Sequence, residues 1–437
     1  MKHPVQFIIQ EHKKDSSRGI YSVCSANRYV LQAAMKQAKE DQSLLLVEAT
    51  SNQVDQFGGY TGMTPFDFIK YVITIAKEND FPSYSLIFGG DHLGPNVWQK
   101  QPAAIAMNNA LDQIRAYVNA GFTKIHLDAS MPLGDDDSDP DMPFNPGLVA
   151  QRSAELCKAA EDTYHQMTSN EFEPVYVIGT DVPIPGGAQA SLENIRITPV
   201  TEVEEIISLT KEAFNRLELE NAWERVVAVV VQPGVEFSDD AVSAYNPRKA
   251  RQLSLYIENI PQMVYEAHST DYQLPDLLKN MVVDHLAILK VGPWLTYAFR
   301  EAVFSLAAIE AELSRLHKNI LPSNIIQILD QVMMDEPKYW IKYYQGSEEQ
   351  KSFARKYSLS DRIRYYWPNK KVGHALDKLI ANLQHHPIPS SLLSQHMPPQ
   401  HQALLDGQIT SQPLDLIHHK IMEILKIYSI ATCMNEK

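Results

Sequence analysis

Short apolar or β-branched runs alternate with longer stretches of helical periodicity over the first 316 residues of the chain. Eight such runs predict strands, at residues 19–25, 44–50, 85–91, 124–130, 175–180, 226–232, 263–269 and 286–292. Each is followed by a stretch long enough for a helix, at 28–40, 65–77, 103–120, 148–167, 202–219, 247–259, 274–283 and 293–316. Eight consecutive strand-then-helix units favour a closed (β/α)8 barrel, the TIM barrel. An open doubly wound sheet stays the structural alternative.

After residue 316 the pattern changes to helices separated by proline-rich breaks, and it contains no strand-rich unit. We therefore expect a barrel over residues 1–316 and a helical C-terminal extension, residues 317–437, packed on it. The segment 357–368 (YSLSDRIRYYWP) places aromatic residues among arginines. Such a cluster can be an anion or partner site, but arginine also commonly fastens a terminal helix to its own domain, and we favour that structural interpretation.

Charge and composition exclude several classes of function. The net charge of −14 leaves no clustered basic surface for a polyanion, so nucleic acid is a poor partner. Three widely spaced cysteines favour reduced thiols. No segment has the length or apolarity of a membrane span or an export signal, so we expect a cytoplasmic protein. Neither a Walker loop nor a GxGxxG motif after the first strand is present, which argues against nucleotide-driven chemistry.

Polar residues gather directly after the predicted strands. They form the clusters EATSN (48–52), GGDHLGPN (89–96), HLDAS (126–130), GTDVPIPGG (179–187), QPGVE (232–236), EAHSTD (266–271) and KVGP (290–293). One cluster alone could be a turn or a helix cap. Seven together predict a site, because barrel enzymes build their active sites at this end of the strands. Asn52, Ser269, Asp271 and Lys290 are the candidate substrate-binding residues among them.

Asp91 and His92 are adjacent at a strand end, so their side chains diverge, and one can bind a metal while the other faces a substrate. A barrel would bring His92, Asp181 and His268 together from three strands. Two imidazoles and a carboxylate can hold Zn²⁺ with an open position for a substrate oxygen. A hydrogen-bonded His–Asp–His network without metal explains the same residues equally well.

Several long motifs resemble one known family. They are EATSNQVDQFGGYTGMTP (48–65), GGDHLGPN, KIHLDAS (124–130), VIGTDVPIPGG (177–187), VVQPGVEF (230–237), YEAHSTDYQ (265–273), ILKVGP and SDRIRYYWP. This set is similar to the Z-type subunits of class II D-tagatose-1,6-bisphosphate aldolase, formerly labelled tagatose 6-phosphate kinases. The resemblance spans nearly the whole chain. It implies a (β/α)8 barrel of class II aldolase type and a non-catalytic subunit that supports a catalytic Y-type subunit in galactitol and N-acetylgalactosamine catabolism.

The more distant resemblance to catalytic class II aldolases assigns roles to individual residues. It implies that Asp91 is the proton-transferring carboxylate and that His92 and His268 are zinc ligands. We expect Asp181 or water to complete the tetrahedral shell. Two departures stand out. Asp181 replaces the glutamate typical of the Z-type family, and Gln232 occupies a strand end where the catalytic family has a zinc-binding histidine. A weakened metal site would leave the reaction without its full electrophile.

Two functional classes therefore stay open. The first is a non-catalytic partner subunit, and the second is an independent metal-dependent aldolase or epimerase acting on a ketose phosphate. A sugar-phosphate kinase ranks last, because no nucleotide motif supports it. The sequence leaves open whether Zn²⁺ is retained and whether the chain forms a homo-oligomer.

Overall fold

The computed structural model describes residues 2–137, 144–167, 172–179 and 195–434. Eight parallel strands close into one barrel in the order β1-β10-β9-β6-β5-β4-β3-β2. The strands are β1 (Ile20–Val23), β2 (Leu45–Thr50), β3 (Leu86–Leu93), β4 (Lys124–Leu127), β5 (Val175–Gly179), β6 (Val226–Val230), β9 (Val264–Ala267) and β10 (Ile288–Val291). Each lies within one of the predicted runs except β3, which runs two residues beyond it. The closed barrel is confirmed, and the open sheet is excluded.

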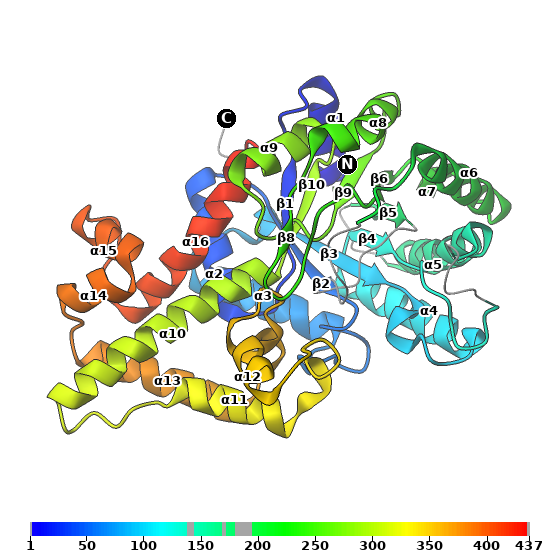
Figure 1. The fold of residues 1–437 in the computed structure, drawn as a ribbon. Coiled ribbons are helices and arrows are strands. Elements are labelled where there is room, and N and C mark those ends of the chain that lie inside the picture. The colour runs from blue at the N-terminus through cyan, green and yellow to red at the C-terminus, as the bar shows by residue number, and fades with distance from the viewer. Residues whose placement is uncertain (1, 138–143, 168–171, 180–194, 435–437) are drawn as a thin grey trace.

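Each strand is followed by a helix of the outer shell (Figure 1). These helices are α2 (Arg28–Asp41), α3 (Pro65–Glu78), α4 (Ala103–Ala120), α5 (Pro146–Gln166), α6 (Val200–Arg216), α8 (Pro247–Glu258), α9 (Pro275–Val283) and α10 (Pro293–Leu316). The short helix α7 (Glu220–Trp223) precedes β6, and the antiparallel pair β7 (Glu236–Phe237) and β8 (Val242–Ser243) lies between β6 and α8. Because strands and helices alternate regularly in the fold, the strand-then-helix pattern of the sequence predicts them.

Strand residues alternate between two apolar cores. Leu45 and Val47 of β2 pack outward against the helices, whereas Leu46 points into the barrel. Helix α1 (Pro4–Lys14), which the sequence analysis did not predict, adds Val5 and Ile9 to the inner core at the starts of the strands. Its start carries recognisable signals, a capping box at His3 followed by proline. Helix α1 therefore closes the end of the barrel opposite the polar clusters.

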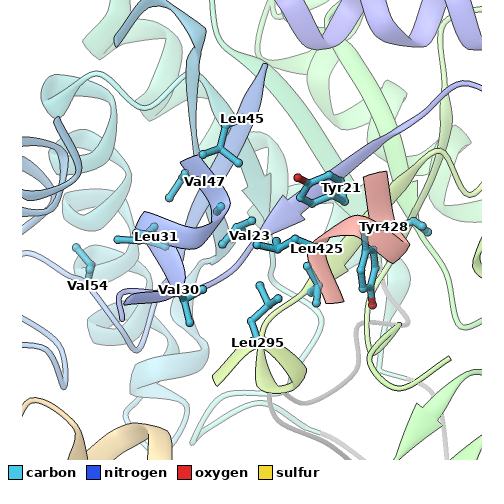
Figure 2. Packing of buried hydrophobic residues seen from close by; sticks show 14 of the residues in the cluster. Tyr21, Val23, Val30, Leu31, Leu45, Val47, Val54, Leu295, Leu425 and Tyr428 are labelled. Atoms are coloured by element: carbon cyan, nitrogen blue, oxygen red, sulfur yellow. The ribbon is translucent and has the colours of Figure 1, made fainter. Parts of the chain in front are cut away.

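The chain after α10 is helical over its described residues, and it returns to the barrel. The helices are α11 (Ile325–Asp335), α12 (Glu348–Tyr357), α13 (Lys370–His385), α14 (Ser390–His396), α15 (Pro398–Leu405) and α16 (Pro413–Ala431). Helix α16 packs against α2, α9 and α10, so the last helix of the extension becomes part of the barrel shell (Figure 1). Figure 2 shows Leu425 and Tyr428 of α16 beside Tyr21, Val23 and Leu295.

We expect Tyr428 to anchor α16. Its ring is fully buried, and its hydroxyl lies 2.9 Å from the Thr270 carbonyl oxygen and 3.0 Å from Thr270 Oγ1. Tyr428→Ala should lower the free energy of unfolding by roughly 3–5 kcal/mol, the usual cost of truncating a buried aromatic side chain. Tyr428→Phe, which keeps the ring, should cost roughly 1–2 kcal/mol. Urea denaturation checks both, and Ile430→Ala on the exposed side of the same helix is the control. Equal losses for Tyr428→Ala and Ile430→Ala would contradict this anchoring role.

Candidate functional site at the mouth of the barrel

A cavity opens at the carboxyl ends of the strands. Its lining includes most of the residues that the sequence analysis assigned, Asn52, Asp91, His92, His268, Ser269, Asp271 and Lys290. Asp181 lies outside the described residues. The structure therefore brings together every predicted site residue that it describes.

Four charged side chains point into the barrel from its strands, namely Glu48 of β2, Lys124 of β4, Glu266 of β9 and Lys290 of β10. Lys124 Nζ lies 2.7 Å from Glu48 Oε1 and 2.6 Å from Glu266 Oε2, and all three side chains are completely buried. Gly89 makes room for them, because a Cβ at this position would lie 2.6 Å from Glu48 Cγ. The interior of the barrel is thus ionic at its centre and apolar below.

Lys290 connects this ionic layer to the mouth. Its ammonium forms an ion pair with Glu48 and lies 3.0 Å from Asp91 Oδ1 and 3.6 Å from Glu266 Oε1. Three carboxylates therefore surround one ammonium group. Together with Lys124, these five side chains carry a net charge of about −1 when all are ionised.

Three imidazoles meet above the ionic layer. The ring centroids of His92, His126 and His268 are 4.8 to 5.2 Å apart. Each ring contacts a carboxylate: His92 Nδ1 lies 2.9 Å from Asp128 Oδ2, His126 Nδ1 lies 3.1 Å from Asp91 Oδ1, and His268 Nε2 lies 3.1 Å from Glu266 Oε1. The motif comparison had expected two imidazoles here, and the structure supplies a third from β4.

The donor atoms of one buried group suit a metal ion. Asp91, His126, Glu266 and His268 each offer a ligand atom, and these atoms all lie within 4.8 Å of one another. His126 Nε2 is buried and has no hydrogen-bond partner among the described residues. Two imidazoles and two carboxylates are a ligand set that zinc accepts, so these residues could hold such an ion. His92 lies beside this group with Nδ1 directed to Asp128, so its assignment as a zinc ligand stays a prediction.

Gln232 does not take the place of a missing imidazole. Its Oε1 accepts hydrogen bonds from the backbone N–H groups of Gly234 at 2.8 Å and Val235 at 3.0 Å. The side chain therefore organises its own loop. Asp271 has a comparable structural contact, because its Oδ1 accepts from the N–H groups of Gly292 and Trp294 at the start of α10.

The charges of the cluster follow from its contacts. Burial raises the pKa of Asp91, but His92 and Lys290 outweigh it and hold that pKa well below its ordinary value. Burial likewise lowers the pKa of His92, but Asp91 and Asp128 outweigh it and the net direction is upward. Burial lowers the pKa of His268 to about 4, so this ring is neutral at pH 7 and has a lone pair to offer.

The C-terminal extension also reaches the mouth. Arg364 and Tyr365 lie in the short 3₁₀ helix Arg362–Tyr366 and line the cavity. Arg364 Nη2 donates to Tyr365 Oη at 2.9 Å, and the Tyr365 ring packs 4.8 Å from that of Tyr60. Arg355 instead joins two helices of the extension through Asp330 at 2.6 Å. Arg355 therefore makes a structural contact within the extension, whereas Arg364 places a cation at the mouth.

Sequence reasoning had missed Glu48, Lys124, His126, Asp128 and Glu266 as individual site residues. One signal was present for four of them: Glu48, Lys124, His126 and Glu266 are polar residues at alternate positions of otherwise apolar strands. In a barrel that alternation places them on the inner surface.

Glu236, beside the mouth on β7, should make stability depend on pH. Burial raises its pKa to about 7 from an ordinary value of 4.5. The folded state therefore binds the proton more tightly, and wild-type stability falls as the pH rises from 4.5 through 7. Glu236→Gln should gain stability relative to wild type over this range, up to roughly 3 kcal/mol at pH 8. Urea denaturation at pH 5 and pH 8 checks this, and an equal difference at the two pH values would contradict it.

A closed parallel barrel with a buried polar site at the carboxyl ends of its strands defines the chain as a (β/α)8-barrel protein of the kind that places its site in the strand-end loops. The sequence model of one family matches residues 5–433, and its description is D-tagatose-1,6-bisphosphate aldolase subunit GatZ/KbaZ-like. The chain belongs to this family.

A solved structure at 40% identity agrees with that placement. The probable tagatose 6-phosphate kinase of Sinorhizobium meliloti 1021 is 40% identical, with a TM-score of 0.85 over 95% of this chain and 100% of that one. The YdjI aldolase of Escherichia coli K12 is 11% identical with a TM-score of 0.42, over 89% of this chain and 98% of that one. Within the described residues, no helix is both long enough and apolar enough to cross a membrane.

Proposed function

We propose that this chain is a non-catalytic subunit of tagatose-1,6-bisphosphate aldolase. It acts in the cytoplasm, in galactitol and N-acetylgalactosamine catabolism, by supporting the activity and stability of a catalytic Y-type subunit. Membership of the aldolase-subunit family supports the proposal that the chain assembles with such a subunit. We infer that the subunit is non-catalytic from the position of Lys290, because its ammonium contacts three of the carboxylates at the site.

Lys290 supplies positive charge where an aldolase of this type needs a metal. A bound divalent metal would stabilise the anion that develops when the carbon–carbon bond breaks. Asp91, His126, Glu266 and His268 are the residues that would hold it. Asp91 and Glu266 already contact Lys290, so an incoming cation meets a charge of the same sign. The ammonium of Lys290 thus partly neutralises these carboxylates in the absence of a metal.

The size of the mouth favours the same conclusion. Its cavity has a volume of about 70 Å³, with Phe237, Arg364 and Tyr365 among the residues that line it. Pockets that enclose small-molecule ligands usually measure roughly 300–1,000 Å³. A bisphosphorylated hexose therefore has little room in this conformation.

An independent metal-dependent aldolase or epimerase acting on a ketose phosphate is the second candidate. The buried group of two imidazoles and two carboxylates favours it, together with an ionised Asp91 beside His92 that could transfer a proton. In that case Asn52, Ser269, Asp271 and Lys290 would face the substrate. Lys290 would then have to exchange its carboxylate contacts for a substrate oxygen.

Lys290→Gln should strengthen Zn²⁺ binding by at least about 100-fold. Two unit charges about 4 Å apart interact by about 4 kcal/mol in partly buried surroundings, so a nearby ammonium strongly opposes a divalent cation. Without Lys290, the remaining charges of Glu48, Asp91, Glu266 and Lys124 sum to about −2, which Zn²⁺ neutralises. Isothermal titration with Zn²⁺ measures the change, and Lys290→Arg, which keeps the charge, is the control. Wild-type protein that retains stoichiometric zinc, and loses it in Lys290→Gln, would contradict the argument.

The proposed assembly is tested by mixing the chain with a Y-type subunit. The two should elute together in size-exclusion chromatography, and the complex should melt at a higher temperature than the Y-type subunit alone. A subunit that binds only the folded state of its partner stabilises that state by mass action. Separate elution together with an unchanged melting temperature would refute the partner role.

A further inference from the structure

A second cavity lies on the outside of the barrel, among α10, the end of α12, the junction of α14 and α15, and α16. Its volume is about 350 Å³, within the range of small-molecule pockets. It shares no lining residue with the mouth, and the residues that line it include Tyr297, Arg300, Glu301, Phe304, Tyr357 and Lys420.

Arg300 is the unusual residue of this cavity. Its side chain is 3% exposed, and neither Nε nor Nη2 has a hydrogen-bond partner among the described residues. Its closest carboxylate oxygen is Asp361 Oδ1, 3.5 Å from Nε, and this contact is not a hydrogen bond. A buried guanidinium carries five N–H donors, and leaving them unpaired is costly. The cavity therefore contains a cation whose hydrogen-bonding capacity is largely unused.

Aromatic rings hold this guanidinium in place. Arg300 Cζ lies 4.0 Å from the ring centroid of Tyr297, 5.3 Å from that of Phe304 and 5.8 Å from that of Tyr357. All three rings also line the cavity. The site thus combines a fixed planar donor with flat apolar walls.

The charges that line the cavity are unbalanced. Lys420 Nζ lies 3.3 Å from Glu301 Oε2, so the carboxylate in the lining is already paired with the second cation. Asp361 does not line the cavity. The counter-ion of Arg300, Asp361, therefore lies outside the lining, and the charges of the lining residues Arg300, Glu301 and Lys420 sum to +1.

We propose that this cavity binds a small organic anion, whose carboxylate or phosphate group pairs with Arg300 and whose flat or apolar body packs among Tyr297, Phe304 and Tyr357. The guanidinium fork matches both headgroups, because each presents two oxygens in one plane. The site is separate from the mouth of the barrel and does not depend on the proposed aldolase role.

Isothermal titration with two probes tests the site on the full chain. Phenyl phosphate and benzoate share a ring and differ in headgroup, and at least one of them should bind saturably with a stoichiometry near one. Benzyl alcohol, which has the ring without the charge, should not bind. Binding of one probe alone identifies the headgroup. The absence of saturable binding by both probes overturns the proposal.

Substitutions in the cavity test whether the probe binds at Arg300. Arg300→Gln should weaken binding at least about tenfold, since hydrogen bonds to charged groups are worth more than neutral ones. Because this change leaves Asp361 buried without its cation, Arg300→Gln combined with Asp361→Asn keeps the charges balanced and should show the same loss. Lys318→Met, which removes an exposed charge outside the cavity, should bind like wild type. Undiminished binding by the double variant would overturn the site.

A crystal of the wild-type chain soaked with the probe that binds gives the direct readout. The anion should lie on Arg300 between the aromatic rings. Density for the probe at another place, with the cavity unaltered, would refute the assignment independently of whether any variant folds.

Discussion

Lys124→Met is expected to lower the free energy of unfolding by about 3–5 kcal/mol, the usual cost of removing one partner from a buried ion pair. Lys124 is completely buried between Glu48 and Glu266, at 2.7 and 2.6 Å. Methionine fills a similar volume but leaves Glu48 and Glu266 to share the single ammonium of Lys290 with Asp91. Chemical denaturation followed by circular dichroism measures the loss.

A second variant separates charge from packing. Lys124→Met combined with Glu266→Gln removes one positive and one negative charge, so the net charge of the ionic layer stays as in the wild type. It should recover a large part of the stability that the single variant loses. Lys158→Met, which breaks an exposed ion pair with Asp162, should change stability by less than about 0.5 kcal/mol. If Lys124→Met proves as harmless as Lys158→Met, the ionic layer does not stabilise the fold.

The barrel could be predicted from the sequence because its signal is local. Each strand is a short apolar run, each helix has its own periodicity, and the eightfold repetition determines the closure. Helix α1 was missed because its apolar run is short and mixed with charges. The position of α16 in the shell could not be predicted either, because its contacts with α2, α9 and α10 join segments far apart in the sequence.

The part of the site that lies directly after the strands could be predicted from the sequence. Asp91, His92 and His268 were found because polar residues after barrel strands converge on one mouth. The ion pair of Lys290 with Glu48 joins residues 242 positions apart, and His126 meets Asp91 only across two neighbouring strands. Such contacts depend on the register of the closed sheet, which apolar periodicity does not specify. The third imidazole and the counter-ion role of Lys290 therefore needed the structure.

The purified chain alone is expected to cleave tagatose 1,6-bisphosphate at a rate below easy detection. Removing one electrostatic contact to the developing anion commonly costs about 10²–10³ in rate. Under the proposed function Lys290 would oppose a metal, and an aspartate at position 181 in place of the family's glutamate would weaken a further predicted contact. The combined loss exceeds what an ordinary assay detects.

The measurement that tests this account most directly is an aldolase assay of the chain alone, a Y-type subunit alone and the two together, each repeated with Asp91→Ala in this chain. We expect no turnover by the chain alone. We also expect higher activity of the mixture than of the Y-type subunit, with the increase kept in Asp91→Ala because assistance needs surface and fold rather than proton transfer. Turnover by the chain alone at an ordinary enzyme rate, about 1–10³ s⁻¹, that Asp91→Ala abolishes would contradict the account and establish an independent aldolase.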